Sequence, residues 1–178
     1  MHGRDAHARV AVAEDLPAIQ ATYAHHVLHG VGTFEEEPPD AAEMATRMAQ
    51  GIAAGGCWLV AESSGAPNGV VGFAYYGPYR PRSAYRFTVE DSVYVDEDAR
   101  GTGIGTALLG GLVQRATAAG FRQMVAAIGS SDNAASIALH ARLGFAEAGV
   151  LRDVGLKFGR MLDVVLMQRA LQPIRSGR

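Results

Sequence analysis

Apolar residues recur at helical spacing in two segments of the N-terminal half. They are Leu16, Ile19, Tyr23 and Val27 in the first segment, and Met44, Met48 and Ile52 in the second. Intervals of three and four residues place apolar side chains in one stripe that can face a core. The pattern predicts a helix from Leu16 to about Leu28 and another after Asp40, with two further helices over 103–119 and 133–143.

The starts of the first two helices carry capping signals. Asp15 can cap the first helix, and Pro17 fits its first turn, where the missing N–H costs nothing. Asp40 is followed three residues later by Glu43, which is a capping-box spacing. The pair Gly55 and Gly56 ends the second helix.

Shorter apolar or alternating runs predict strands between these helices. The expected strands cover residues 9–13, 57–62, 70–76, 86–95, 123–128 and 161–170. Turn-forming residues over 63–69 favour an antiparallel hairpin, and 77–85 reads as a loop. The mixed order of strands and helices predicts a layered α/β (α+β) domain without repeats, spanning residues 1–172 and followed by a tail at 173–178.

The most informative stretch is a glycine turn between a strand and a helix. Residues 93–95 end the strand, and Arg100-Gly101-Thr102-Gly103-Ile104-Gly105-Thr106 leads straight into apolar helical spacing. Glycines let backbone N–H groups approach an anion at the positive end of a helix, so the turn fits a phosphate group. A dinucleotide fingerprint would need glycine where Thr106 stands, and a Walker P-loop would need Gly-Lys-Ser/Thr, which is absent.

A second motif follows in the order expected of one family. Residues 133–145 run from Asn133 through Ser136 and His140 to Gly144-Phe145. Together with the glycine turn, they resemble the GNAT superfamily of N-acetyltransferases. The resemblance implies the GNAT fold, a mixed and mostly antiparallel central sheet flanked by helices. It implies acetyl-CoA as co-substrate, held by residues Val93, Tyr94, Val95, Arg100, Gly101, Thr102, Gly103, Ile104, Gly105, Thr106, Asn133 and Ser136.

Finer features resemble one branch, the phosphinothricin and methionine sulfoximine acetyltransferases. The matching segments are Thr33-Phe34-Glu35, residues 89–95, and Gly155-Leu156-Lys157-Phe158-Gly159 with Asp163. This resemblance implies a homodimer and a small substrate with an α-amino group beside a carboxylate. It also implies a small pocket near Phe34, Glu35, Tyr79 and Lys157.

Backbone groups of residues 93–95 are expected to bond pantetheine like an added strand, one N–H polarising the thioester carbonyl. The side chains of these residues can equally be core residues.

An amine attacks a thioester only when neutral, so a group must accept its proton. Glu90 is the candidate base because it shares a strand face with Thr88, Ser92 and Tyr94. Asp91 faces the other way and is a weaker rival. His140 stands where many GNAT enzymes have a tyrosine that protonates the CoA thiolate, and it is a candidate for that role or for a CoA contact.

Three arginines before the candidate catalytic strand can bind an acidic group of the substrate. Arg80, Arg82 and Arg86 lie in and after the predicted loop with Tyr79, and a guanidinium fork suits a carboxylate or phosphinate. The sequence does not select one of them.

Charge and composition narrow the partners. The formal net charge is -2, so no global field favours nucleic acid or anionic lipid, and no segment approaches the length of a membrane span. We expect a cytoplasmic protein without nucleic-acid or membrane partners. His25, His26 and His29 have metal-like spacing, but no third ligand is nearby, so no metal is expected. Two alternatives stay open: a GNAT that acetylates protein N-termini or lysines, and a non-catalytic acetyl-CoA sensor.

Overall fold

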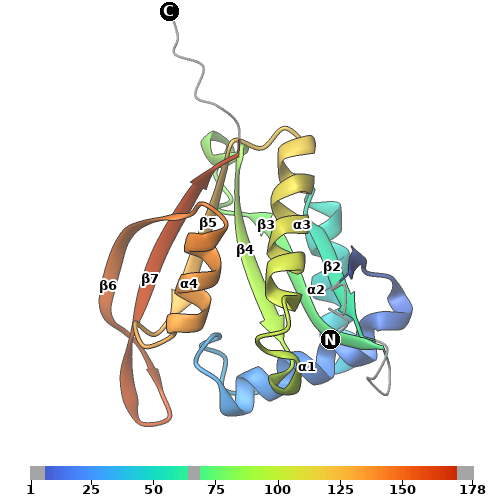
Figure 1. Ribbon diagram of the computed structural model, residues 1–178, viewed down its shortest axis with the longest axis horizontal. Coiled ribbons are helices and arrows are strands. Elements are labelled where there is room, and N and C mark those ends of the chain that lie inside the picture. The colour runs from blue at the N-terminus through green and yellow to red at the C-terminus, as the bar shows by residue number, and fades with distance from the viewer. Residues whose placement is uncertain (1–6, 64–68, 172–178) are drawn as a thin grey trace, which may run out of the picture.

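The computed structural model describes residues 7–63 and 69–171. Its core is one seven-stranded sheet in the order β1-β2-β3-β4-β5-β7-β6 (Figure 1). The strands are β1 His7–Val10, β2 Cys57–Glu62, β3 Val70–Pro78, β4 Thr88–Val95, β5 Gln123–Gly129, β6 Ala146–Lys157 and β7 Arg160–Ala170. The predicted tail at 173–178, both ends of the predicted domain and most of the predicted turn at 63–69 lie outside the described residues.

Four α-helices cover the two faces of the sheet. They are α1 Leu16–His29, α2 Ala41–Ala53, α3 Ile104–Ala118 and α4 Ala134–Arg142. Helices α3 and α4 lie in front of the sheet in Figure 1, and α1 and α2 lie behind it. None of the helices in the described part of the chain is long and apolar enough to cross a membrane.

Each face has its own hydrophobic cluster. Leu108, Leu109 and Leu112 of α3 are fully buried against one face. Ile19 and Val27 of α1 are fully buried against the other, in a cluster with α2 and the aromatic residues of β2, β3 and β4. The alternation of side chains along a strand therefore decides which layer each residue of β4 faces.

Most of the predicted elements are confirmed. The hairpin of β2 and β3 is antiparallel, and the side chain of Asp40 accepts a hydrogen bond from the Glu43 N–H at 2.8 Å. Together with the mixed, mostly antiparallel sheet, these features confirm the predicted α/β class.

Two expectations near the N-terminus are wrong. The first strand ends at Val10, and residues 13–15 form a 3₁₀ turn instead. Asp15 does not cap α1 with its side chain, because its carboxylate is held by Arg9 at 2.7 Å and by the N–H of Val12 at 2.8 Å.

Strand β6 was not predicted from the sequence. Ten of its twelve residues are exposed or half-buried, and only Gly155 and Lys157 are buried. Its pairing with β7 shifts register between Glu147 and Gly149 and again between Leu151 and Gly155. Such irregularities remove the strict period-two alternation by which a strand is recognised in a sequence.

The α1–α2 connection crosses to the far half of the sheet and is anchored there by Phe34. The Phe34 ring packs directly against Gly155 and Gly129. A Cβ atom added to Gly155 would collide with the ring, and one added to Gly129 would lie only 3.0 Å from it. Lys157 Nζ donates to the Thr33 carbonyl at 2.8 Å, and the Lys157 side chain is only 1% exposed. The two glycines make a slot for the ring, so the connection bridges β5 and β6 to the helices behind the sheet.

Candidate active site

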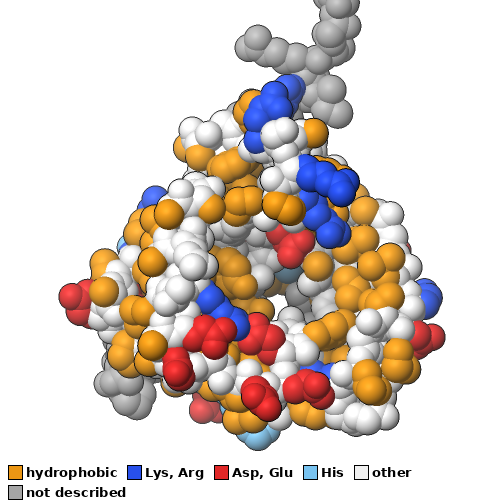
Figure 2. Space-filling model, turned by 180° about the vertical axis from the view of Figure 1, so that it is seen from behind, with side chains coloured by type: hydrophobic (Ala, Val, Ile, Leu, Met, Phe, Trp, Pro, Cys, Tyr) orange, Lys and Arg blue, Asp and Glu red, His pale blue; other side chains and the backbone are white. Residues whose placement is uncertain are grey.

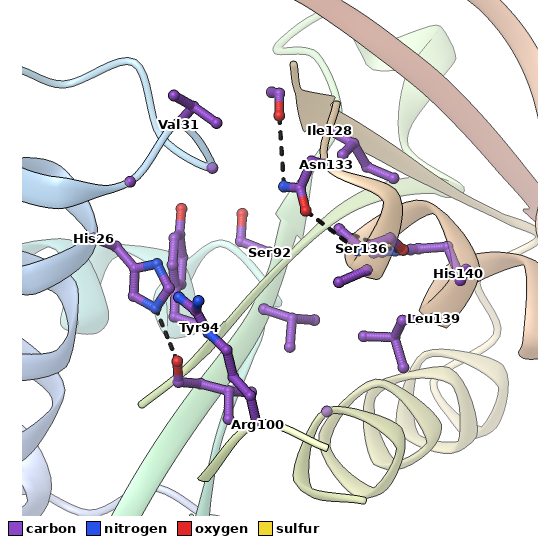
Figure 3. A pocket seen from close by; sticks show the side chains of 18 of the residues that line it. His26, Val31, Ser92, Tyr94, Arg100, Ile128, Asn133, Ser136, Leu139 and His140 are labelled. Atoms are coloured by element: carbon purple, nitrogen blue, oxygen red, sulfur yellow. Dashed lines mark hydrogen bonds between the residues drawn. The ribbon is translucent and has the colours of Figure 1, made fainter. Parts of the chain in front are cut away.

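The sheet splits between β4 and β5. These parallel strands pair only from Thr88–Gln123 to Asp91–Ala126, although β4 continues to Val95 and β5 to Gly129. Beyond the split, β4 still pairs with β3 and β5 with β7, but the backbone groups that face the gap between β4 and β5 have no partner in the sheet and are available to a ligand. A cavity of about 820 Å³ opens there, lined by both strands, the start of α3 and one side of α4 (Figure 3).

The glycine turn lies at one end of this cleft. Gly101 and Gly103 have φ values of 75° and 90°, the left-handed region that glycine tolerates. Gly103 is the N-cap of α3 and provides no side-chain cap, so the N–H groups of residues 104–106 have no partner within the helix. Arg100 lies beside them, more than half exposed. The predicted anion site therefore consists of free N–H donors, the positive end of a fifteen-residue helix and one guanidinium.

The backbone N–H and C=O groups of β4 point toward the cleft at every second residue. The N–H of Asp96 donates to Val71 on β3, whereas the Val95 carbonyl lies 3.0 Å from His26 Nε2 on the opposite side. Because backbone groups alternate along a strand, Val93 and Val95 direct theirs toward the cleft and Tyr94 directs its own toward β3. The side chains of these three residues pack in the core, the alternative that the sequence left open.

His26 was not predicted to act here, because its helical spacing to His29 first indicated a possible metal pair. Burial lowers the pKa of His26, so the ring is favoured in its neutral form, donating from Nε2 to the Val95 carbonyl. Within residues 7–63 and 69–171, no group of three or more His, Cys, Asp or Glu side chains is placed to hold a metal ion.

Asn133 joins the end of β5 to the start of α4. Its side chain accepts from the Ser136 N–H at 3.3 Å and donates to the Gly129 carbonyl at 3.5 Å. Both residues line the cleft, as do Val93, Tyr94, Val95, Arg100, Gly101, Gly103, Gly105, Thr106 and His140. Two of the predicted contacts are not part of the lining: Thr102 donates to the Ala99 carbonyl, and the Ile104 side chain is buried in the core.

Glu90 and Asp91 face opposite layers just before the split. Glu90 of β4 lies directly opposite Gly77 of β3, and its side chain is half-buried. Burial and the charge of Asp91 raise the pKa of Glu90 above its ordinary value, and the charge of Arg80 offsets part of this. Glu90 does not line the cleft itself, but the next two residues, Asp91 and Ser92, do. A carboxylate with a raised pKa next to a cleft is suited to proton transfer.

Asp91 is buried against His140 on α4. The distance between His140 Nε2 and Asp91 Oδ2 is 2.9 Å, and the other ring nitrogen lies 2.7 Å from the Ser136 carbonyl. Since a carbonyl only accepts, Nδ1 carries a proton and one further proton lies between Nε2 and the carboxylate. Burial lowers the pKa of His140, but the hydrogen bond and charge of Asp91 raise it by more, so it lies above its ordinary value.

Both ring nitrogens of His140 are thus occupied, so its assignment as the acid stays a prediction. To protonate a thiolate, His140 would have to pass its proton through Asp91, whose Oδ1 has no hydrogen-bond partner within the described residues. Alternatively, the imidazole ring would have to reorient first.

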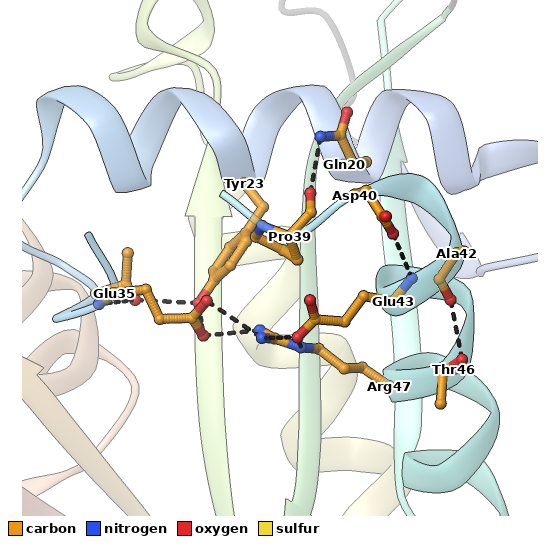
Figure 4. A network of polar contacts seen from close by, with 10 residues as sticks. Gln20, Tyr23, Glu35, Pro39, Asp40, Ala42, Glu43, Thr46 and Arg47 are labelled. Carbon is orange, nitrogen blue, oxygen red and sulfur yellow. Dashed lines mark hydrogen bonds and ion pairs between the residues drawn. The ribbon is translucent and has the colours of Figure 1, made fainter. Parts of the chain in front are cut away.

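The predicted substrate residues fall into two groups. Phe34, Glu35 and Lys157 hold the α1–α2 connection in place. Glu35 accepts from Arg47 at 2.7 Å and from the Tyr23 hydroxyl at 2.9 Å (Figure 4). Arg47 was missed by the sequence analysis, although its i,i+4 spacing from Glu43 was a visible signal.

The three arginines are exposed, and they differ in what they contact. Arg80 lies over the Tyr79 ring at 5.0 Å, and its charge acts on Glu90. Arg86 lies over the Phe87 ring at 4.8 Å and donates to the Ser83 carbonyl. Of the three arginines, Arg80 is therefore the candidate whose charge lowers the pKa of the candidate base.

The sequence and fold match known acetyltransferases. Residues 20–145 match the acetyltransferase (GNAT) family. The chain belongs to this family. It is 54% identical over 163 residues to a phosphinothricin N-acetyltransferase of Alcaligenes faecalis, covering 92% of this chain and 81% of that one. It is 45% identical to an L-methionine sulfoximine/L-methionine sulfone acetyltransferase of Pseudomonas aeruginosa, covering 94% and 96%.

A solved GNAT structure has the same architecture. The GNAT superfamily phosphinothricin acetyltransferase from Sinorhizobium meliloti, in complex with AcCoA, superimposes with a TM-score of 0.91 at 47% identity. The match covers 97% of this chain and 92% of that one. The predicted GNAT fold is confirmed.

We predict that Gly103→Val weakens acetyl-CoA binding by about tenfold or more, because a branched side chain would push the pyrophosphate away from the N–H donors. The matched control is Gly120→Val at the other end of α3, where φ is 87° instead of 90°. Both variants strain the backbone equally, but only Gly103 faces the cleft. Calorimetry of both folded variants decides; equal affinities would reduce the turn to a simple connection.

Proposed function

We propose that this protein transfers the acetyl group of acetyl-CoA to the α-amino group of a small amino-acid-like substrate of the phosphinothricin, methionine sulfoximine or methionine sulfone type. The observation that carries the proposal is the position of Glu90, half-buried on β4 one residue before the pairing with β5 ends, on the strand that leads into the anion-binding turn. The names of its relatives and the AcCoA complex of the neighbouring structure support it.

The residues suggest a division of the reaction. Glu90 accepts a proton from the ammonium group, directly or through water, and the neutral amine attacks the thioester carbonyl. A β4 N–H on the cleft side, at Val93 or Val95, stabilises the negative oxygen of the tetrahedral intermediate. The nitrogen of this intermediate is cationic and releases a second proton to solvent, and the intermediate then collapses to the neutral amide and the CoA thiolate. The thiolate then takes a proton from solvent or from the His140–Asp91 pair.

The two alternatives make different demands on the chain. A GNAT that acetylates protein N-termini or lysines needs an open groove, whereas the α1–α2 connection is fixed across this face by Phe34, Glu35 and Lys157. A sensor needs the glycine turn but not Glu90. A thiol-release screen with phosphinothricin, methionine sulfoximine, methionine sulfone, common amino acids and a peptide amine separates these functions. Turnover of the small amino acids supports the proposed function. Turnover of the peptide alone supports a protein acetyltransferase, and no turnover of any amine supports a sensor.

We predict that Glu90→Gln lowers kcat by about 10²–10⁴-fold and leaves the acetyl-CoA dissociation constant unchanged, because the amide keeps the shape but cannot accept a proton. In wild type, activity should fall as the pH drops through the pKa of Glu90, and this limb should lie above the range of an ordinary glutamate because the pKa is raised. The limb should disappear in the variant. A variant as active as wild type from pH 6 to 9 would remove Glu90 from the mechanism.

We predict that Arg80 binds the substrate's carboxylate. Arg80→Ala should lower kcat/KM by about 10- to 1,000-fold, and Arg80→Lys should restore only part of it, because an ammonium lacks the two-pronged geometry. Arg82→Ala is the control, since Arg82 is also an exposed arginine of the same loop but does not contribute to the pKa shift of Glu90. Methionine sulfoximine is compared with its methyl ester in each variant. If the ester reacts as well as the acid in wild type, this loop does not select acids.

We further propose that the protein is a cytoplasmic homodimer without nucleic-acid or membrane partners. Support for a dimer comes from the outer edge of the sheet. Large apolar side chains gather on β6, β7 and their turn, each about half or more exposed: Leu151, Val154, Leu156, Phe158 and Met161. An exposed apolar cluster on an edge strand is a typical interaction surface.

We expect sedimentation equilibrium to give twice the chain mass of 18.7 kDa. Leu156→Asp should shift the protein toward monomer, because Leu156 is 64% exposed within this cluster. Leu28→Asp is the matched control, being 50% exposed on α1 away from the hairpin. A monomeric wild type, or equal effects of the two variants, would contradict this interface.

A further inference from the structure

A second cavity of about 220 Å³ opens on the α1/α2 face, apart from the cleft. Figure 2 shows this face hollowed, with hydrophobic and charged side chains around the hollow. Its walls are mainly aromatic and apolar: Tyr23, Met44, Trp58, Phe73, Tyr75 and Gly77. Trp58 stacks on Tyr75 with ring centroids 4.3 Å apart and on Phe73 at 5.9 Å, so one side is a continuous wall of rings. We refer to this cavity as the aromatic slot.

The aromatic slot lies next to the candidate base. Gly77 and Tyr75, which line it, pair across the sheet with Glu90 and Ser92. Directly opposed residues in antiparallel strands place their side chains on the same face about 5 Å apart. The slot and the cleft share no lining residue, but Ser92 lines the cleft beside Tyr75. A substrate whose amine reaches Glu90 can therefore extend its side chain into the slot.

Gly77 keeps the way into the slot open. A Cβ built on Gly77 has no atom within 4 Å, so the space beside Glu90 on that face is empty. The slot holds about seven groups of water size at roughly 30 Å³ each. The side chain of methionine sulfone has six non-hydrogen atoms and fits in the slot. The side chain of phosphinothricin has the same size, so charge and not size has to distinguish the two.

The charge in the slot is already compensated. Arg47 is the one cationic residue of the lining, and four of its five N–H groups donate to carboxylates: two to Glu35 and two to Glu43 (Figure 4). Tyr23 donates its hydroxyl to Glu35 as well. One guanidinium N–H is left, with two carboxylates around it. Such a site can donate to a neutral oxygen, but an anion would meet a net negative surrounding.

We propose that the aromatic slot binds the side chain of the acceptor amino acid and selects an uncharged, unbranched chain, such as that of methionine sulfone, over an anionic one such as the phosphinate of phosphinothricin. This inference rests on the proposed function, with the amine at Glu90 and the carboxylate at Arg80. It adds which of the relatives' substrates this chain prefers, and why.

The first test ranks substrates of the wild-type enzyme. The probes are methionine sulfone, norleucine, alanine and phosphinothricin at saturating acetyl-CoA, with kcat/KM as the measured quantity. We expect methionine sulfone to exceed both alanine and phosphinothricin by roughly tenfold or more, and norleucine to exceed alanine. A higher kcat/KM for phosphinothricin than for methionine sulfone would overturn the inference while leaving acetyl transfer intact.

The second test narrows the slot. Gly77→Val should lower kcat/KM for methionine sulfone and norleucine by roughly tenfold more than for alanine, because the added side chain fills the entrance. Gly77→Ala should give a smaller change in the same direction. The control, Gly110→Ala on α3, also adds a Cβ in open space but lies on the other face of the sheet and should leave all ratios unchanged.

The outcomes separate the two levels of the proposal. If wild type acetylates no amino acid, the proposed function itself fails. If it acetylates all the probes but Gly77→Val and Gly77→Ala slow alanine as much as methionine sulfone, the side chain does not occupy the slot. The ratio of two substrates is used because any disturbance of Glu90 affects both equally.

Discussion

The end of parallel pairing between β4 and β5 is the constraint on which the rest of the site depends. Past Asp91 and Ala126 the strands diverge and leave unpaired backbone at the centre of a sheet, where such groups are costly unless something binds them. The split opens the cleft, and it puts the starts of α3 and α4 at its walls. Without a ligand, His26 already hydrogen-bonds one of these carbonyls, that of Val95, so this backbone group is not left unpaired.

Two adjacent carboxylates acquire different chemistry because a strand alternates. Glu90 stays at a half-open surface with a raised pKa, whereas Asp91 is buried with a histidine as its partner. Neighbouring acids with separate surroundings are a common means by which one site holds a base and a separate proton reserve. The assignment of the two roles thus follows from which layer of the fold each side chain enters.

Much of this could be predicted from local sequence, and the remainder depended on distant contacts. The glycine turn, the Asn133 cap and the opposite directions of Glu90 and Asp91 follow from spacing over a few residues. The partner of Asp91 could not be found that way, because His140 lies 49 residues further along the chain.

The limits elsewhere have similar physical causes. Strand β6 lacked alternation because its register breaks twice. The ion pair of Glu35 with Arg47 could not be found from the sequence, since a glutamate facing a pocket and one paired with an arginine twelve residues away look alike there. The bounds of the first strand were wrong because Arg9 draws Asp15 back into a 3₁₀ turn.

The separation of the cleft from the aromatic slot bears on how ligands are exchanged. Since no residue lines both, an amino acid could enter and leave without passing the nucleotide end of the cleft. The acetyl donor and the acceptor would then meet only at the split, where β4 and β5 no longer pair. If the acceptor binds in the aromatic slot as proposed, neither ligand blocks the other's exit, and steric access imposes no compulsory order of product release.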